Sequence, residues 1–350
     1  MKTLLFFCEF NRMKKELVEK GRNRQMKITI KDIAKATNVS YSTVSKALND
    51  SPLVKPDTKQ FILEKANELG YTPNYSAKYL VTKRTNTIGL VWPEINRLAL
   101  SELASQVNDQ MKKQHKQMLL SINDALESID LFSKMRVDGM LLFEEDLPQD
   151  QLPKTLDVPL LSYGVPSINQ FPTIGVKHEL AMELAVQELV SCKNQSIAYV
   201  GVIGGSGRRQ QAKENGFRKA MEKVSLEPLF IQTGGLDVGD AMREVRDYLS
   251  GEKLPDALIC SSYDIAIGTY RALRQSGLRV PEDVSLISYD NIPQFAETEV
   301  PISAVGVPVE LLAKTLVDEL IHLIENPGHE HSGCELIPEL VVRRSSQNVR

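Results

Sequence analysis

The sequence predicts an α/β protein in which a small all-α unit precedes a two-lobed, Rossmann-like body. Three short helical patterns occur before residue 71. Beyond residue 86, short apolar strands alternate with helical segments, as in parallel sheets covered by helices. The 350 residues are enough for about two or three domains. With 42% hydrophobic and 25% charged residues, a mainly disordered chain is disfavoured.

Residues 1–25 are expected to form a loose N-terminal extension. An apolar run opens the chain, but Glu9 ends it before it reaches the ~7–15 residues of a secretory core. No segment approaches the ~18 apolar residues of a membrane span. The four cysteines lie far apart without a CxxC pair, which fits a reducing cytosol better than a disulfide framework. We therefore expect a cytoplasmic protein with no membrane partner.

Charge divides the chain into a basic head and an acidic body. Lys and Arg outnumber Asp and Glu by seven to three in residues 1–25 and by ten to five in residues 26–85. Because the net charge of the whole chain is -3, residues 86–350 carry an excess of twelve acidic groups. Such an asymmetry points to a polyanion as the partner of the head.

Two helical patterns meet at a tight turn within the basic head. Ile30 and Ile33 share one face of the first helix, and Thr29 is suited to its N-cap. Asn38 can adopt the left-handed conformation that closes this helix. The second helix is expected over residues 41–48, with its apolar positions turned inward.

A third helix completes the unit. Pro56 is suited to its first turn, and the helix is expected to end at Leu69 with Gly70 in the following C′ position. Its apolar face is predicted to comprise Phe61, Ile62, Ala66 and Leu69. Three short helices with one tight turn are typical of a helix-turn-helix unit, whose second helix enters the major groove of DNA.

The outward face of the second helix carries hydrogen-bonding side chains: Tyr41, Ser42, Ser45, Lys46 and Asn49. These groups suit base edges and phosphates. No acidic residue occurs from Val39 to Asn49, which favours a surface that faces an anion.

The runs TIKDIA at 29–34, VSYSTVSKALN at 39–49 and LGYTPN at 69–74 together resemble the lactose-repressor (LacI/GalR) family of bacterial transcription regulators. The resemblance implies a helix-turn-helix domain over 26–73 and a hinge over 74–85. It further implies a periplasmic-binding-protein-like effector-binding and dimerisation domain over 86–345. Asn38 stands where the family usually has Gly. Lys46 replaces a frequent Arg, and Lys cannot make the rigid bidentate contact to guanine.

The resemblance also implies roles for single residues in the head and hinge. The positions that face bases are Tyr41, Ser42 and Lys46. The positions that hold phosphates are Thr29, Ser40, Thr43, Ser45, Asn49 and Thr58. In the hinge, Ala77 and Lys78 face the minor groove, and Leu80 is the apolar wedge that unstacks a central base step.

The sequence of the body predicts two parallel α/β sheets with a ligand cleft between them. Strands are expected at residues 87–93, 118–121, 139–143, 159–163, 196–201, 229–231, 257–260 and 285–289. The chain is expected to cross between the lobes near 175, 305 and 328. Ligands then bind at the carboxyl ends of the strands.

Six cleft residues follow from the family's positions: Trp92, Arg97, Tyr163, Lys213, Tyr263 and Asp290. Aromatic rings can stack on a sugar, and Asp290 can accept hydrogen bonds from its hydroxyl groups. Arg97 and Lys213 favour an acidic sugar or a sugar phosphate. Each of the six can alternatively be an ordinary surface or core residue. The neighbouring pair Arg208-Arg209 is either an anion contact or a solvated edge, and the solvated edge is the favoured interpretation.

The sequence contains partial motifs for catalysis, cofactor binding and metal binding, but their residues do not have the spacing that these functions require. Gly204-Gly205-Ser206-Gly207 matches neither GxGxxG nor a phosphate-binding loop ending in GK[ST], and Ser206 is not in GxSxG. His329, His331 and Cys334 supply only three close metal ligands, within a loop rich in Gly and Pro. We therefore expect no enzyme activity and no cofactor.

These observations predict a sequence-specific DNA-binding regulator, most plausibly a repressor of a carbohydrate-utilisation operon. Its expected partners are a palindromic operator in double-stranded DNA, a second copy of the chain, and a sugar, sugar acid or sugar phosphate bound between the lobes. The alternative is a ligand receptor of the binding-protein fold whose head binds a protein.

The hinge assignment generates a first prediction. Leu80→Ala is expected to lose most of the specific affinity for operator DNA, because the wedge no longer unstacks the base step. Weak binding that depends on salt is expected to persist. Gel shifts on specific and scrambled duplexes, together with a DNA-bending assay, measure both effects. Unchanged operator affinity and bending would exclude the wedge.

Overall fold

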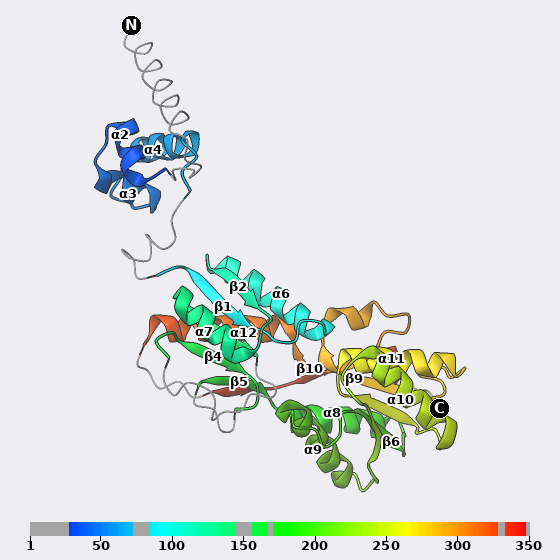
Figure 1. The fold of residues 1–350 in the computed structure, drawn as a ribbon. Helices are drawn as coiled ribbons and strands as arrows, with labels where there is room; N and C mark the ends of the chain where they lie inside the picture. Colours follow the sequence, from blue (N-terminus) through cyan, green and yellow to red (C-terminus); the bar gives the residue numbers. More distant parts are fainter. Residues whose placement is uncertain (1–27, 73–83, 144–155, 167–170, 328–332, 348–350) are drawn as a thin grey trace. The chain divides into compact units, whose positions relative to one another are not determined.

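A computed structural model describes residues 28–72, 84–143, 156–166, 171–327 and 333–347 (Figure 1). The chain divides into two compact units, Met1–Lys83 and Arg84–Arg350, which are described separately. The predicted extension over 1–25, the hinge residues Ala77, Lys78 and Leu80, and His329 and His331 lie outside the described residues.

The small unit contains three helices, α2 (Ile30–Thr37), α3 (Tyr41–Leu48) and α4 (Pro56–Glu68). Its core consists of buried apolar side chains contributed by all three helices: Ile33, Val44, Ala47, Val54, Ile62 and Ala66. The predicted helices are confirmed to within about one residue at each end. Phe61 was wrongly placed on the apolar face of α4 and is 48% exposed. Ile62 and Ala66 lie one turn apart on the buried face, so Phe61 points away from it.

Local hydrogen bonds fix the turn between α2 and α3. The Asp32 carboxylate accepts hydrogen bonds from the backbone N–H of Thr29 at 2.9 Å and from its hydroxyl at 2.7 Å. Asn38 adopts the left-handed conformation with φ 52°, as predicted. The Ser40 hydroxyl accepts from the backbone N–H of Thr43 at 3.1 Å and caps α3. These contacts set the angle at which α3 leaves the turn.

The first lobe of the large unit is a six-stranded sheet in the order β11-β5-β4-β3-β1-β2, with every described pairing parallel. Its strands are β1 (Thr87–Val91), β2 (Gln117–Ser121), β3 (Gly139–Phe143), β4 (Leu160–Tyr163), β5 (Thr173–Val176) and β11 (Cys334–Leu336). Helices α6 (Leu98–Lys113) and α12 (Val309–Glu325) pack against each other, and α7 (Ala125–Met135) contributes to a separate cluster.

The second lobe is a six-stranded sheet in the order β12-β10-β9-β8-β6-β7. Its strands are β6 (Ile197–Gly201), β7 (Leu229–Gln232), β8 (Ala257–Cys260), β9 (Ser285–Asn291), β10 (Ser303–Pro308) and β12 (Glu339–Val341). Only β12 runs antiparallel to its neighbour among the described strands. Helices α8 (His178–Ser191) and α9 (Arg208–Lys223) pack together, as do α10 (Val238–Gly251) and α11 (Tyr263–Gln275).

Three crossings connect the lobes. The chain crosses after Val176, at the end of β5, and after Pro308, at the end of β10, close to the predicted positions. The third crossing lies between Leu336 and Glu339, so the prediction near 328 is wrong. The chain first adds β11 to the first sheet, beside β5, and only then crosses to β12. Strands of three residues are too short to show a period in the sequence.

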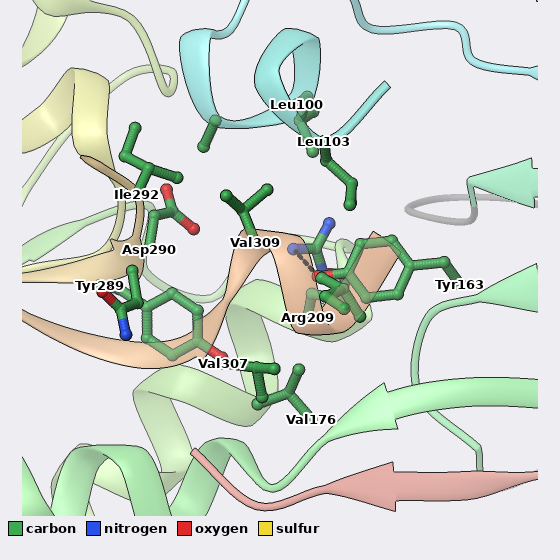
Figure 2. A pocket seen from close by; sticks show the side chains of 13 residues that line it. Leu100, Leu103, Tyr163, Val176, Arg209, Tyr289, Asp290, Ile292, Val307 and Val309 are labelled. Atoms are coloured by element: carbon green, nitrogen blue, oxygen red, sulfur yellow. Dashed lines mark hydrogen bonds between the residues drawn. The ribbon is translucent and has the colours of Figure 1, made fainter. Parts of the chain in front are cut away.

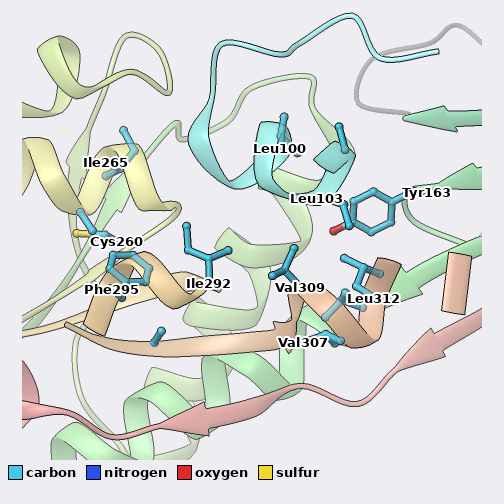
Figure 3. Close-up of a cluster of buried hydrophobic side chains, with 14 of the residues drawn as sticks. Leu100, Leu103, Tyr163, Cys260, Ile265, Ile292, Phe295, Val307, Val309 and Leu312 are labelled. Carbon is cyan, nitrogen blue, oxygen red and sulfur yellow. The ribbon is translucent and has the colours of Figure 1, made fainter. Parts of the chain in front are cut away.

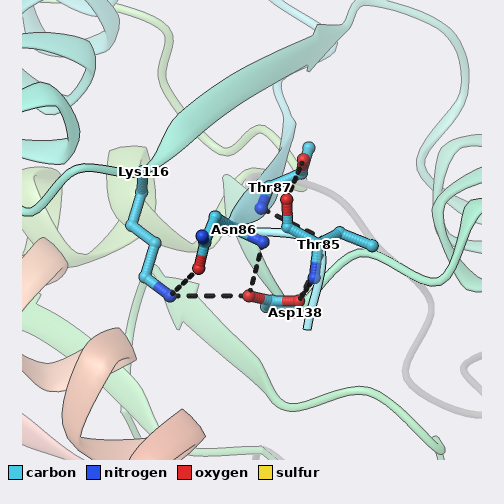
Figure 4. A network of polar contacts seen from close by, with 5 residues as sticks. All are labelled: Thr85, Asn86, Thr87, Lys116 and Asp138. Atoms are coloured by element: carbon cyan, nitrogen blue, oxygen red, sulfur yellow. Dashed lines mark hydrogen bonds and ion pairs between the residues drawn. The ribbon is translucent and has the colours of Figure 1, made fainter. Parts of the chain in front are cut away.

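A buried polar network lies at the amino ends of β1, β2 and β3 (Figure 4). The side chain of Asp138 is 3% exposed, and that of Lys116 is 10% exposed. One Asp138 oxygen accepts from the backbone N–H of Thr85 at 2.6 Å. The other accepts from the backbone N–H of Asn86 at 2.9 Å and from Lys116 Nζ at 3.4 Å. Asp138 therefore holds the start of β1 against the start of β3.

This network predicts a large loss of stability when Asp138 is removed. Asp138→Ala leaves Lys116 buried without its carboxylate and should lower the free energy of unfolding by about 3 kcal/mol. The matched control is Asp109→Ala, which breaks the exposed Lys112–Asp109 pair and should cost less than about 0.5 kcal/mol. Urea unfolding followed by circular dichroism measures both. Equal losses in the two variants would mean that the network contributes nothing special.

Candidate functional site

The exposed face of α3 presents hydrogen-bonding groups to solvent. Tyr41 is 52% exposed, and Ser42, Lys46 and Asn49 are exposed as well, whereas Val44 points into the core. The structure thus turns the predicted base-facing residues outward on one short helix. With no acidic side chain from residue 39 to 49, this face suits an anionic partner.

The predicted phosphate contacts surround this face, and several of them also stabilise local structure. Ser40 and Thr43 share a hydroxyl–hydroxyl bond of 2.9 Å at the start of α3. The Asn49 amide donates to the carbonyl of Ser45 at 2.8 Å at the end of α3. Thr58 is half-buried in the first turn of α4. Their contacts with phosphate remain predictions.

A cavity lies between the two lobes of the large unit, close to the first two crossings (Figure 2). Its volume is about 40 Å³, and the cavity is partly open to solvent. Side chains from the first lobe and α12 line it together with residues from α9, β9 and β10. The lining is Ala99, Leu100, Leu103, Tyr163, Val176, Arg209, Tyr289, Asp290, Asn291, Ile292, Val307, Val309 and Leu312. Tyr163 and Asn291 end their parallel strands here, which is the expected place for a ligand.

The cavity is apolar on one side and polar on the other. Leu100, Val309 and Leu312 belong to a buried hydrophobic cluster that continues to Phe295 in the second lobe (Figure 3). Tyr163, Arg209 and Asp290 supply the polar groups. A mostly apolar surface with a few placed polar groups is typical of a small-molecule site.

Tyr163 and Asp290 are the two predicted cleft residues that line this cavity. Asp290 has a left-handed backbone, with φ 77°, and one carboxylate oxygen accepts from the backbone N–H of Tyr263 at 2.9 Å, at the start of α11. The helix N-terminus thus holds the carboxylate in place at the edge of the cavity.

The other four predicted cleft residues lie outside the lining. Trp92 is fully buried against Phe143, with ring centroids 4.8 Å apart, and stacking of a sugar on Trp92 stays a prediction. Lys213 is fully buried behind the cavity, and its Nζ donates to the carbonyl of Ser261 at 2.8 Å. The remaining two residues are also placed elsewhere: Arg97 pairs with Glu94 at 3.3 Å, and Tyr263 borders a separate depression on the second lobe.

Arg209 is a polar residue of the cavity that the six predicted cleft residues did not include. It is 3% exposed and lines the cavity, so its interpretation as a solvated edge was wrong. Its guanidinium lies 4.9 Å from the ring centre of Phe143 and 4.7 Å from that of Tyr163, and Nη2 donates to the Tyr163 hydroxyl at 3.2 Å. Arg209 shares the buried face of α9 with Lys213, one turn further on. That spacing of four residues was the available signal.

A buried histidine contacts Tyr289, one of the residues that line the cavity. His178 is 5% exposed, and its Nδ1 lies 2.6 Å from the hydroxyl of Tyr289. Burial holds the pKa of His178 well below its usual range, and the positive charges of Lys213 and Arg209 lower that pKa further. Burial likewise raises the pKa of Tyr289. Lys213 Nζ lies 3.9 Å from the ring centre of Tyr289. Both groups therefore act as neutral hydrogen-bonding partners near pH 7.

Within the described ranges, no three His, Cys, Asp or Glu side chains gather as metal ligands would. Cys334, one of the three ligands considered above, is exposed, and its two His partners fall outside the ranges. None of the described helices is both long and apolar enough to span a membrane.

Comparison with known families matches both parts of the chain. Residues 29–74 match the family described as "Bacterial regulatory proteins, lacI family", and residues 186–346 match a "Periplasmic binding protein-like domain". The "Probable HTH-type transcriptional repressor ExuR" of Bacillus subtilis (strain 168) is 32% identical over 330 residues, covering 91% of this chain and 98% of that protein. Catabolite control protein A of Priestia megaterium is 28% identical over 314 residues, covering 85% and 95%.

Solved structures show the same fold. A lac repressor dimer bound to operator and the anti-inducer ONPF has a TM-score of 0.78 at 24% identity, covering 91% of this chain and 99% of that one. The transcriptional regulator CelR in complex with cellobiose has a TM-score of 0.64 at 24% identity, covering 91% and 100%. Both confirm the predicted combination of an all-α head with a two-lobed α/β body.

His178 generates a prediction for stability against pH. The folded protein keeps His178 neutral, whereas the unfolded chain binds a proton below a pKa of about 6.5. This contribution to stability is complete above that pH and falls as the pH drops, by about 1.4 kcal/mol per unit. His178→Asn, which can still bond to Tyr289, should flatten the loss between pH 7 and 5, and the exposed-site control His322→Asn should not. Urea unfolding at several pH values in that range measures the free energy of unfolding. Parallel plots of this free energy against pH for wild type and His178→Asn would contradict the assignment of a neutral, buried His178.

Proposed function

The chain belongs to the lacI family of bacterial regulatory proteins, and we propose that it represses a carbohydrate-utilisation operon under the control of a sugar-derived effector. It is a DNA-binding transcription regulator, not an enzyme. We place its action in the cytoplasm, where it binds a palindromic operator as a homodimer. Several of the matched relatives are repressors, among them the "Ribose operon repressor" of Haemophilus influenzae, at 28% identity over 337 residues.

The observation that carries the DNA-binding role is the exposed face of α3. Tyr41, Ser42 and Lys46 reach solvent from a helix whose other side is anchored by Val44 and Ala47 in the core. A rigid helix presented in this way enters the major groove without rearranging the unit. Side chains at the capped start of α3, Ser40 and Thr43, are proposed to position it on the phosphates.

Each DNA-binding unit contacts one half-site of the operator. An operator with two inverted half-sites therefore shares a two-fold axis with a dimer of the protein. A three-helix unit contacts only a few base pairs, and a second copy about one helical turn away doubles that contact. The closed symmetry of a dimer matches an inverted repeat. We therefore expect the operator half-sites to lie about ten base pairs apart from centre to centre.

Effector control is proposed to act through the cavity between the lobes. Because both lobes line it, a ligand held there changes the relative stability of their open and closed arrangements. Tyr163 from β4 and Asp290 from β9 would contact the same ligand from opposite lobes. A ligand can shift DNA binding only by its differential affinity for the two arrangements.

The test of the function is selection of DNA from a randomised duplex pool by the full-length protein. An inverted repeat should be enriched, and its affinity should fall steeply as the salt concentration rises. Failure to prefer any inverted repeat over scrambled competitor, with or without metabolites, would overturn the proposal.

Lys46 provides the matched mutational prediction. Lys46→Ala should weaken binding to the selected operator by roughly tenfold or more and relax the preference at one position in each half-site. Non-specific binding should change much less, because the lost contact is to a base. The control is Lys65→Ala on α4, where Lys65 is paired with Glu68 at 2.6 Å. Gel shifts on the operator and on single-base variants measure this, and equal effects of the two substitutions would exclude Lys46 from base readout.

A further inference from the structure

The beginning of α6 contacts both the cavity and the second lobe. Ala99, Leu100 and Leu103 line the cavity from the first lobe. Leu100 also belongs to the buried hydrophobic cluster that includes Phe295 of η2 (Pro293–Ala296), a short 3-10 helix of the second lobe (Figure 3). The contact between α6 and the second lobe is entirely non-covalent, because the three crossings lie elsewhere in the chain.

One polar contact joins the side of α6 to η2. The Gln294 amide donates through Nε2 to one carboxylate oxygen of Glu102 at 2.9 Å. The other oxygen of Glu102 accepts from Gln106, one turn further along α6, at 3.0 Å. Gln106 thereby helps to fix the direction of the carboxylate. A hydrogen bond to a charged group is stronger than one between neutral groups, so this pair favours the arrangement in which the lobes meet.

A second polar contact joins the N-terminus of α6 to α11. The Asp264 carboxylate of the second lobe accepts a hydrogen bond from the backbone N–H of Leu98, the first residue of α6, and is attracted by the charge of Arg97. A carboxylate at this place stabilises the partial positive charge of the helix N-terminus. Arg97 provides no side-chain cap for α6, and the first turn of the helix contains no acidic residue. The second lobe therefore supplies the cap that α6 lacks within its own lobe.

Each of these contacts also has a cost. Oδ2 of Asp264 and Oε1 of Gln294 are buried and have no hydrogen-bond partner among the described residues. Such oxygens lose their hydrogen bonds to water when the lobes meet, and this loss offsets part of the gain. Burial raises the pKa of the Asp264 carboxyl for the same reason. The two contacts thus stabilise the closed arrangement modestly, so a ligand with a moderate preference for an open arrangement can reverse it.

The cavity behind α6 is too small for a sugar in the described arrangement. Its volume of about 40 Å³ accommodates about three water molecules. A cavity that holds benzene has about 150 Å³, and benzene is smaller than a pentose or a hexose. An effector of that size therefore needs the two lobes to move apart before it can occupy the cavity.

We propose that the Glu102–Gln294 and Asp264–Leu98 contacts form a latch that holds the unliganded lobes closed, and that the latch must open for the effector to bind. The inference rests on the proposed function, because it describes how the effector cavity is regulated. The latch residues act on the equilibrium between the two lobe arrangements. They therefore set the fraction of the protein whose cavity admits the effector, and with it the apparent affinity for the effector.

The test begins with variants that need no effector. Gln294→Glu places a second carboxylate against Glu102 and should open the latch. The double variant Glu102→Gln/Gln294→Glu restores an amide–carboxylate pair in the opposite direction and should close the latch again. The matched control is Gln187→Glu, because Gln187 donates to Glu183 at 3.2 Å within α8. The control creates the same repulsion inside a single lobe.

Hydrogen exchange of the full-length protein, resolved by mass spectrometry, measures opening at the amide of Leu98. Because Asp264 accepts from this amide, exchange requires the second contact of the latch to open. Gln294→Glu should accelerate it by about tenfold or more, since a hydrogen bond to a charged group is lost. The double variant and the control should exchange like the wild type. Unchanged exchange in the central strand β8 distinguishes opening of the latch from global unfolding.

Operator binding without sugar then tests the connection between the latch and regulation. Gln294→Glu should change the affinity for the selected operator by roughly fivefold or more, because the populations of the two arrangements shift. The double variant should restore the affinity of the wild type. Stronger binding by Gln294→Glu would show that the open arrangement binds the operator, and weaker binding would show that the closed arrangement does.

Three results would overturn the inference: unchanged exchange at Leu98 in Gln294→Glu, equal acceleration in Gln187→Glu, or an operator affinity that Gln294→Glu leaves unaltered. Gln294→Met removes the hydrogen-bond donor without adding a charge, and it replaces Gln294→Glu if that variant does not fold. A wild type without preference for inverted repeats would refute the proposed function and not the latch, because the exchange measurement does not involve DNA.

Discussion

The three crossings between the lobes are the constraint on which the arrangement of the body depends. They place the carboxyl end of β5 and the ends of β9 and β10 around one cavity, which the first helical turn of α12 closes from the other side. Two separate domains joined by one linker would drift relative to each other. Here Val176, Val307 and Val309 lie at the crossings and line the cavity. A ligand held in this cavity would therefore contact residues that connect the two lobes.

The polar residues of the cavity illustrate how a binding site is maintained against stability. Asp290 has a left-handed backbone, and Arg209 places a cation at the positive end of a helix. Neither choice favours the unliganded fold. The neutral His178–Tyr289 pair, by contrast, avoids a third charge in the same region, because burial and the two cations keep the imidazole unprotonated.

The sequence was sufficient for the helices of the small unit, because their signals are local. Thr29, Asn38 and Gly70 act through their own backbone neighbours, and the structure has each of them where the turn chemistry requires. The cavity was only half predictable. Tyr163 ends β4 and Asp290 is the last residue but one of β9, and strand ends follow from the apolar pattern. Trp92 and Lys213 lie outside the cavity lining and Arg209 belongs to it, because the placement of a side chain depends on packing between distant segments. The short strands β11 and β12, which set the third crossing, have no detectable period.

A rigid element connects the cavity to the beginning of the large unit. Phe143, against which Arg209 lies, ends β3, and Asp138 immediately precedes the same strand. Five residues of extended chain separate their positions by roughly 17 Å, with little freedom to bend inside a six-stranded sheet. Asp138 in turn holds Thr85 and Asn86, which directly follow the segment between the two units. A change of lobe arrangement that moves β3 must therefore also move the point from which the DNA-binding unit is tethered. Coupling between effector and operator then requires two arrangements of the lobes that differ in the position of Thr85 and Asn86. It does not require a continuous path of side chains.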